Sequence, residues 1–115
     1  MKRYLFLDDT EARHILFGQM CRGLATVDHV RTVAEACAKL ANEKYDTVWL
    51  DHDLGNTDPG NDGCMVAKFL AGDDHDPTLR PSSVVIHSWN TVEAPKMKAV
   101  LDSAGIPTTL KPFSV

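Results

Sequence analysis

Residues 46–53 read DTVWLDHD, and this stretch decides the fold class. Its apolar centre, residues 48–50, is continuous rather than alternating, which indicates a strand covered on both faces. Strands of this kind are typical of parallel sheets with helices on both sides. Further short β-rich runs lie at residues 3–7, 24–30, 83–88 and 107–110. The sequence therefore predicts a parallel sheet of five strands.

Stretches with helical periodicity separate these strands. Apolar residues recur at helical spacing from Thr10, an expected N-cap, to Gly23, an expected C-cap. We expect three more helices at residues 32–40, 65–70 and 92–104. Strands that alternate with helices are typical of an α/β fold. Because neither repeats nor a linker interrupt the pattern, we expect residues 1–115 to form a single domain.

Composition excludes several classes of function. The 12 basic and 16 acidic residues give a formal net charge of −4, which argues against binding of bulk nucleic acid through a basic face. No apolar run approaches the roughly 20 residues of a membrane span. The three cysteines, Cys21, Cys37 and Cys64, form no C-x-x-C pair. They suggest a cytoplasmic protein in which cysteines serve as small buried hydrophobes on helices.

Polar residues follow four of the predicted strands. In a parallel α/β sheet, the ligand site lies beyond the carboxyl ends of the strands, so these residues should meet in one crevice. Carboxylates that meet there repel one another, and a divalent cation such as Mg²⁺ relieves the repulsion. A hydroxyl and an ammonium group beside them can bind phosphate oxygens. The sequence predicts a phosphoryl-handling site made by DD at residues 8–9, DHD at 51–53, HS at 87–88 and KP at 111–112.

The order and spacing of these groups resemble the receiver domain of response regulators over essentially the whole chain. The resemblance rests on acids after the first and third strands, a serine after the fourth and a lysine after the fifth. It implies a flavodoxin-like three-layer sandwich with strand order 2-1-3-4-5. It also implies Mg²⁺ held by Asp8, Asp9 and Asp51, with Asp51 accepting a phosphoryl group from a histidine kinase. Phosphate contacts would then come from Ser88 and Lys111.

Two residues depart from ordinary receivers, which have apolar side chains just after the acceptor Asp and just before the serine. His52 and His87 stand at these places. The strings LDHDLG at residues 50–55 and HSWN at 87–90, together with Arg13, are similar to the cyclic-phosphate processing receiver family. That resemblance implies processing of cyclic phosphates or cyclic nucleotides in prokaryotic defence or conflict systems.

The two imidazoles leave alternatives open. A neutral histidine takes or gives a proton near pH 7 and also binds transition metals. One ring can activate water against a strained cyclic phosphodiester while the other protonates the leaving oxygen. Alternatively, His52 joins the aspartates as a ligand for Mn²⁺ or Zn²⁺. A third alternative is that one ring points into the sheet–helix interface, because neighbours on a strand face opposite sides. This alternative applies most to His87, since Ser88 is the expected crevice residue.

We therefore predict metal-dependent hydrolysis of a cyclic phosphate or cyclic nucleotide, with Mg²⁺ or Mn²⁺ as cofactor. The alternatives are a stand-alone receiver phosphorylated on Asp51, and a protein that sequesters a cyclic nucleotide without turnover. The predicted catalytic residues are Asp51, His52 and His87. The predicted metal ligands are Asp8, Asp9, Asp51 and Asp53, and the predicted phosphate ligands are Ser88, Lys111, Arg13 and Asn90.

The end of the sequence differs from an ordinary receiver, in which a fifth helix follows the fifth strand and covers one sheet face. Only residues 113–115 follow Pro112. Without that helix, part of one sheet face stays exposed, and exposed apolar patches mark interfaces. We expect a homodimer or a docking partner to cover this face near the first helix and the fifth strand. We also expect a cis Lys111–Pro112 peptide bond, as is usual in receivers.

Overall fold

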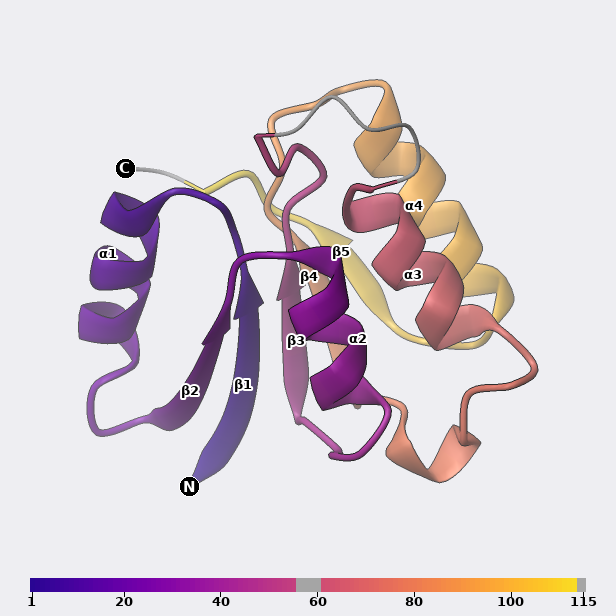
Figure 1. The fold of residues 1–115 in the computed structure, drawn as a ribbon, viewed down its shortest axis with the longest axis horizontal. Coiled ribbons are helices and arrows are strands. Elements are labelled where there is room, and N and C mark those ends of the chain that lie inside the picture. Colours follow the sequence, from indigo (N-terminus) through magenta and orange to yellow (C-terminus); the bar gives the residue numbers. More distant parts are fainter. Residues whose placement is uncertain (56–60, 114–115) are drawn as a thin grey trace.

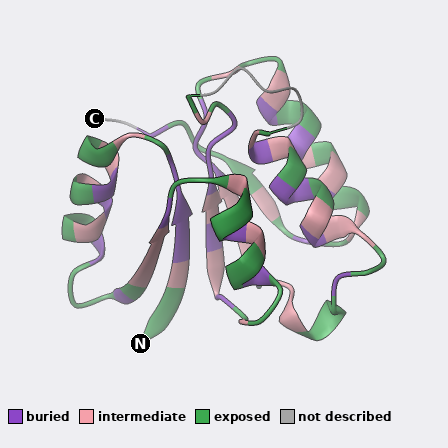
Figure 2. Cartoon of the chain, viewed as in Figure 1, coloured by how far each residue is buried: buried purple, intermediate pink, exposed green. Residues whose placement is uncertain are grey.

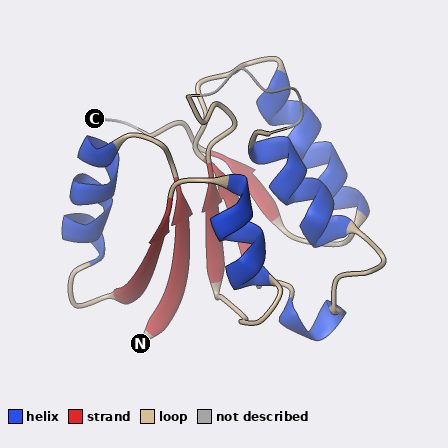
Figure 3. Ribbon diagram, viewed as in Figure 1, coloured by secondary structure: helices blue, strands red, loops and turns tan. Residues whose placement is uncertain are grey.

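A single parallel sheet forms the centre of the molecule. The computed structural model describes residues 1–55 and 61–113. The sheet order is β2-β1-β3-β4-β5 (Figures 1 and 3), which confirms the predicted α/β fold and strand order. Its strands are β1 (Lys2–Leu7), β2 (Ala25–Val30), β3 (Thr47–Leu50), β4 (Ser83–Ile86) and β5 (Thr108–Leu110).

Helices cover both faces of this sheet. One face carries α1 (Glu11–Cys21), and the other carries α2 (Val33–Leu40), α3 (Gly63–Ala71) and α4 (Glu93–Ser103), as Figure 1 shows. A short 3-10 helix, η1 (Pro77–Leu79), precedes β4. The layers are those of the predicted flavodoxin-like sandwich, and no helix follows β5 among residues 111–113. Within the described ranges, no helix has the length and apolar character needed to cross a bilayer.

Two apolar clusters fill the spaces on either side of the sheet. The larger joins strand residues such as Leu5 and Ile86 to α2, α3 and α4. The smaller joins Phe6 to Phe17 and Phe113 on the α1 face. Successive strand residues face opposite sides, which is why the neighbours Leu5 and Phe6 belong to different clusters. Figure 2 shows the buried residues along the strands and on the inward sides of the helices.

The central strand β3 is covered unequally on its two faces. Val48 and Leu50 are fully buried in the larger cluster, as their continuous apolar run predicted. Trp49 lies between them in sequence, packs against the smaller cluster and stays half-buried. The α1 face of the sheet is therefore the less completely covered of the two.

Two strands, β3 and β4, end one and two residues before the predicted Asp51 and Ser88, yet their hydrogen-bond ladders continue. Leu50 is the last residue of β3 and Ile86 the last of β4. The Asp51 N–H donates to the Leu7 carbonyl at 3.2 Å, and the His87 N–H donates to the Leu50 carbonyl at 2.9 Å. These bonds fix the direction of the first residues beyond the sheet, where the polar side chains are found.

Three local expectations need correction or refinement. Thr10 occupies the N-cap position of α1, but its side chain makes no capping hydrogen bond. Cys21 is buried as predicted, whereas Cys37 and Cys64 are only half-buried against the edge of the larger cluster. All three cysteines are free thiols.

The expected cis Lys111–Pro112 bond is wrong, because the described residues contain no cis peptide. The Lys111 N–H donates to the Ile86 carbonyl at 2.9 Å, and the Phe113 N–H donates to the His87 carbonyl at 3.0 Å. The chain beyond β5 therefore continues in an extended course beside the end of β4. A trans peptide bond suits this extended course.

Candidate metal and phosphate site

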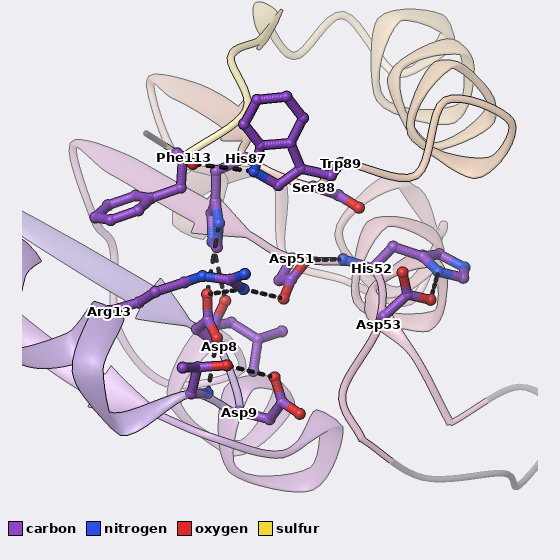
Figure 4. A network of polar contacts seen from close by, with 12 residues as sticks. Asp8, Asp9, Arg13, Asp51, His52, Asp53, His87, Ser88, Trp89 and Phe113 are labelled. Carbon is purple, nitrogen blue, oxygen red and sulfur yellow. Dashed lines mark hydrogen bonds and ion pairs between the residues drawn. The ribbon is translucent and has the colours of Figure 1, made fainter. Parts of the chain in front are cut away.

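Three carboxylates from two neighbouring strands meet at the carboxyl end of the sheet. Asp8 and Asp9 follow β1, and Asp51 follows β3, which pairs with β1. One oxygen from each residue lies within 4.8 Å of the other two. Asp8 and Asp51 are buried, whereas Asp9 is exposed. The structure thus brings together three of the four predicted metal ligands (Figure 4).

The two buried carboxylates divide their oxygens in the same way. The Asp8 Oδ1 accepts a hydrogen bond from the Thr10 N–H at 2.8 Å, and the Asp51 Oδ1 accepts one from the His52 N–H at 2.9 Å. Both Oδ2 atoms face one guanidinium group. The Arg13 Nη1 lies 3.3 Å from Oδ2 of Asp8 and 3.6 Å from Oδ2 of Asp51. Arg13, predicted as a phosphate ligand, therefore bridges two of the predicted metal ligands.

Burial and like charge leave Asp51 poorly stabilised as an anion. Desolvation and the neighbouring Asp8 raise the pKa of Asp51 to about 7, against the opposing effects of Arg13 and the His52 N–H. A divalent cation favours the ionised form of such a carboxylate, and Mg²⁺ prefers hard oxygen ligands. The donor set of Asp8, Asp9 and Asp51 therefore fits an ion of this class.

His52 does not face the three carboxylates. Its ring points away from Asp51 in Figure 4 and is almost fully buried beside the first turns of α3 and α4. Its Nδ1 lies 2.9 Å from Oδ1 of Asp53, and its Nε2 lies 3.4 Å from Oδ2 of Asp62 and 3.8 Å from Oε2 of Glu93. The imidazole is surrounded by acids, and of these only Asp53 lines the cavity beside the carboxylate cluster. Asp53, predicted as a metal ligand, lies outside that cluster.

His87 lies in the core on the α1 side of the sheet, opposite to His52. Its ring stacks on Phe6 with centroids 4.9 Å apart, and it approaches Phe113 edge-on at 6.0 Å. The Nε2 contacts the Leu7 carbonyl at 3.1 Å, and the Nδ1 lies 3.7 Å from Oδ2 of Asp8. Burial lowers the pKa of His87, so its ring is neutral at pH 7. His87 therefore approaches the site at Asp8, but its Nδ1 has no hydrogen-bond partner among the described residues.

Ser88 and Asn90 organise the loop that leads into α4. The Ser88 Oγ accepts a hydrogen bond from the Asn90 N–H at 3.0 Å. The Asn90 Oδ1 accepts from the N–H groups of Val92 and Glu93 at 3.1 and 2.9 Å. A serine hydroxyl that accepts one hydrogen bond still has its own proton to donate. Ser88 therefore remains compatible with a phosphate contact, while the Asn90 carbonyl oxygen is engaged at the start of the helix.

Lys111 lies apart from the acids. It is exposed and lines a cavity of about 110 Å³ on the α1 face together with Met20, Trp49 and Phe113. Its neighbour Leu110 lines a different cavity beside α4, so the two side chains leave the chain on opposite sides. In this arrangement, the ammonium group predicted to bind phosphate does not line the acidic cavity.

Two glycines allow the chain to approach the carboxylates closely. A Cβ atom on Gly63 would lie 1.9 Å from the Asp51 carbonyl oxygen, and the Gly63 N–H donates to the His52 carbonyl at 3.0 Å. Gly55 has a φ of +72°, and a Cβ atom there would lie 2.5 Å from Oδ2 of Asp9. Side chains at either position would therefore displace the site.

A cavity of about 290 Å³ opens beside the acids. Sequence reasoning did not select Trp89, although the indole lines this cavity directly after Ser88. It also missed Asp62 and Glu93, the two further acids beside His52. A tryptophan next to a predicted phosphate ligand was a signal in the sequence. Asp62 caps α3 and Glu93 begins α4, and no sequence pattern links either of them to His52. The lining residues are Asp9, Thr10, Arg13, Asp51, Asp53, Gly55 and Trp89.

Solved structures with similar folds include response regulators and receiver domains. The chain matches a response regulator from Burkholderia pseudomallei, solved with a phosphorylated aspartic acid, a calcium ion and citrate, with a TM-score of 0.70 and 19% identity. The match covers 100% of this chain but only 62% of that regulator.

Two further structures have similar scores. The receiver domain of a sensor histidine kinase from Pseudomonas aeruginosa PAO1, with a coordinated magnesium ion, gives a TM-score of 0.70 at 18% identity over 98% of this chain and 87% of that one. A Thermotoga maritima response regulator in complex with Mg²⁺ and BeF gives a TM-score of 0.71 at 22% identity, over 99% of this chain and 88% of that one. At these identities, the likeness establishes the fold.

A match to a family model identifies the family of this chain more specifically than the structural similarities do. No curated protein matches the chain. The model of the cyclic-phosphate processing receiver domain matches residues 3–103, which include the three clustered aspartates, Arg13 and both histidines of the site. Because that match spans most of the sequence and agrees with the fold and the position of the acids, the chain belongs to the family of cyclic-phosphate processing receiver domains.

Proposed function

We propose that this protein uses a divalent metal ion, Mg²⁺ or Mn²⁺, to hydrolyse a cyclic phosphate or cyclic nucleotide. The observation that carries the proposal is the cluster of the Asp8, Asp9 and Asp51 carboxylates, two of which, Asp9 and Asp51, line one cavity, in a member of this family. These three residues would hold the ion, which would act as a Lewis acid toward a phosphoryl oxygen. Receivers of similar fold from Pseudomonas and Thermotoga carry magnesium, which supports the choice of ion.

Hydrolysis adds water across one ester bond of the ring. The water oxygen bonds to phosphorus, the bond between phosphorus and the leaving oxygen breaks, and the leaving oxygen takes up a proton. Arg13 lines the cavity and brings a fixed positive charge to the phosphoryl oxygens. Ser88 has a hydroxyl proton to donate, but it lines the adjoining apolar cavity rather than the acidic one. The chain therefore offers charge neutralisation on the phosphate from its own side chains.

Proton transfer in this proposal runs through Asp53. Asp53 lines the cavity, whereas His52 does not. The His52 Nδ1 lies 2.9 Å from Oδ1 of Asp53. His52 therefore positions Asp53 and exchanges a proton with it. His87, the other predicted catalytic residue, takes no part in this route, because its Nδ1 lies 3.7 Å from Oδ2 of Asp8 without a hydrogen bond between them.

The test is a panel of cyclic nucleotides and nucleoside 2′,3′-cyclic phosphates with Mg²⁺ or Mn²⁺, with the products separated by chromatography. We expect Asp51→Asn to abolish turnover. We expect His52→Ala to lower kcat by about a hundredfold and to change the pH profile of kcat, since acid–base groups contribute on that scale. Asp74→Asn, which changes an exposed acid in the loop after α3, is the matched control and should behave as wild type.

The same experiment decides between the proposal and its alternatives. A ligand that binds tightly and returns intact identifies a sequestering protein. A panel without turnover or binding leaves a receiver that is phosphorylated on Asp51, which the receiver fold favours. Labelling with acetyl phosphate, lost in Asp51→Asn, would then identify the phosphoacceptor. A cytoplasmic setting is supported by the three free thiols, and a role in prokaryotic defence by the family resemblance alone.

A further inference from the structure

Trp89 presents a fixed aromatic surface to solvent. Its residue exposure is 64%, high for the largest apolar side chain. The Nε1–H donates a hydrogen bond to the Phe113 carbonyl at 3.0 Å (Figure 4). The polar atom of the indole is thus occupied by the protein, and the bond restrains the ring. An aromatic side chain held in this way is preorganised to bind another flat ring.

The indole stands between two cavities. On one side lies the acidic cavity of about 290 Å³, which Trp89 shares with Asp51 and Arg13. On the other lies a cavity of about 280 Å³ whose lining is mainly apolar and includes Pro95 and Leu110. Each is just below the roughly 300 Å³ at which small-molecule sites begin, whereas a ligand that extends over both has ample room. Such a ligand has an anionic end and a flat apolar end.

We propose that Trp89 is the stacking platform for the nucleobase of a nucleotide ligand whose phosphate lies beside Arg13 and Asp51. This inference rests on the proposed function and narrows its substrate class from cyclic phosphates in general to those that carry a base. Stacking on an aromatic side chain accepts every base, because each has a π-face. The inference therefore predicts that the ligand must carry a base. Purines should be favoured over the smaller pyrimidines, without strict selection of one particular base.

The other tryptophan provides an internal contrast. Trp49 is half-buried on the α1 face against Phe17 and Tyr4, away from both cavities. The protein has only these two tryptophans. A Trp49→Phe variant therefore leaves Trp89 as the sole tryptophan, and its fluorescence then reports on the proposed platform directly.

Binding of ligands that cannot be hydrolysed as cyclic esters tests the inference separately from catalysis. Adenosine 3′-monophosphate, ribose 5-phosphate and inorganic phosphate are titrated calorimetrically in the presence of Mg²⁺. We expect the adenosine compound to bind about tenfold or more tighter than ribose 5-phosphate, because stacking of one base is worth that much. It should also quench the fluorescence of Trp89 in the Trp49→Phe protein, whereas inorganic phosphate should not.

Variants of Trp89 complete the experiment. Trp89→Ala should remove the preference for the adenosine compound and leave the affinity for inorganic phosphate unchanged, which also reports that the acidic cavity is intact. Trp89→Phe should retain most of the preference, since a smaller π-face remains. Trp49→Phe should match wild type. Equal binding of the two sugar phosphates by the wild type, or an unchanged preference in Trp89→Ala, overturns the inference.

Failure of the inference and failure of the proposed function have different signatures. Hydrolysis of cyclic phosphates without any preference for a base leaves the function standing and overturns the role of Trp89. A Trp89-dependent preference in a protein that hydrolyses nothing supports the platform and overturns catalysis. No binding of any of these phosphates in Mg²⁺, together with no hydrolysis in the panel of cyclic phosphates, overturns both.

Discussion

His52 and His87 each stand beside a polar residue of the site, yet their surroundings are opposite. His87 is enclosed by Phe6 and Phe113 on the α1 side of the sheet. His52 lies on the α3 and α4 side among the carboxylates of Asp53, Asp62 and Glu93. A histidine that lies next to a site residue in the sequence can therefore have its ring either in the apolar core or among carboxylates.

The difference shows that the two faces of the sheet contribute differently to the site at its carboxyl end. On the α1 side, aromatic packing holds His87 neutral and places it behind Asp8. On the other side, the acids at the starts of α3 and α4 and Asp53 of the loop after β3 gather around His52, and Asp53 lines the cavity. The first region supports the metal ligands by packing, and the second offers groups that can carry a proton. Four predictions test this division, in order of decreasing effect.

The largest effect is expected from Gly63→Ala on the His52 side. The added Cβ atom would lie 1.9 Å from the Asp51 carbonyl oxygen and 3.0 Å from the His52 Cα, and the backbone contact leaves no flexible group to move. We expect a loss of stability of about 3 kcal/mol or more, because overpacking against backbone forces the chain to shift. Chemical denaturation measures the loss, and magnesium titration should show a weakened site.

Gly18→Ala in α1 is the control for that change. The nearest atoms to its added Cβ belong to His29 at 3.7 and 3.8 Å, which is ordinary contact. Alanine in a helix interior is favoured over glycine by about 0.5–1 kcal/mol, so this variant should be more stable than wild type. If Gly63→Ala is tolerated as well as Gly18→Ala, the close approach of α3 to Asp51 is wrong.

The second prediction concerns pH in the absence of metal. Asp51 has a pKa of about 7 in the fold against an ordinary 3.8, so the folded chain keeps a proton that the unfolded chain loses. The stability from Asp51 is present below pH 3.8 and is lost as the pH rises through about 7. For His87 the direction is opposite. Its pKa is lowered from 6.5, so its contribution is present above pH 6.5 and is lost at lower pH.

Between pH 4.5 and 6.5, chosen to lie within both windows, the two contributions offset each other. In Asp51→Asn, the free energy of unfolding should rise with pH in this range, and in His87→Phe it should fall with pH. Each slope is at most about 1.4 kcal/mol per pH unit. Urea denaturation in chelator measures both. Asp8 faces both groups, with Arg13 and Asp9 close to Asp51, so parallel slopes in the two variants would show that these neighbours dominate instead.

The third prediction concerns Arg13, which contacts the same carboxylate oxygens that a metal ion would use. Arg13→Ala should bind Mg²⁺ several-fold more tightly, because the competing cation is gone. Without metal, the variant should lose about 1 kcal/mol of stability, a small value since the guanidinium is partly exposed. Calorimetry measures the affinity for Mg²⁺, and thermal unfolding without metal measures the loss of stability.

Arg31→Ala is the matched control, because Arg31 pairs with Glu11 on the surface at 2.8 Å, outside the site. It should leave the affinity for Mg²⁺ unchanged. Weaker Mg²⁺ binding in Arg13→Ala would mean that the arginine holds the carboxylates in position for the metal rather than competing with it.

The smallest effect is expected at the α1 face beyond His87. There Met20 is 61% exposed beside half-buried Trp49, and the two line a small cavity with Phe113. We expect a second copy of the chain to cover this face, giving a dimer by light scattering at micromolar concentration. Met20→Glu should shift the dimer to monomer, while Met65→Glu on α3, a comparable exposed position, should not. A wild-type monomer would contradict this expectation.

Much of the fold follows from local sequence. The continuous apolar run of β3 and the alternation of strands with helices were enough for the sheet, because both reflect burial that the chain must achieve. The same reasoning placed Asp8, Asp9 and Asp51 together, since carboxyl ends of parallel strands meet. It was less successful with Lys111, because which side of an extended chain faces the crevice depends on where the sheet ends.

The sequence by itself determined the three-layer fold, the strand order through its resemblance to receivers, and the trio of aspartates at one end of the sheet. Tertiary structure decided among the alternatives left open for His87, which is a core residue as strand alternation had suggested. It alone decided that Arg13 bridges Asp8 and Asp51 and that Trp89 borders two cavities. The physical reason is that burial and charge depend on partners distant in sequence. No local pattern specifies the distance between a guanidinium and two carboxylates, or which cavities an indole borders.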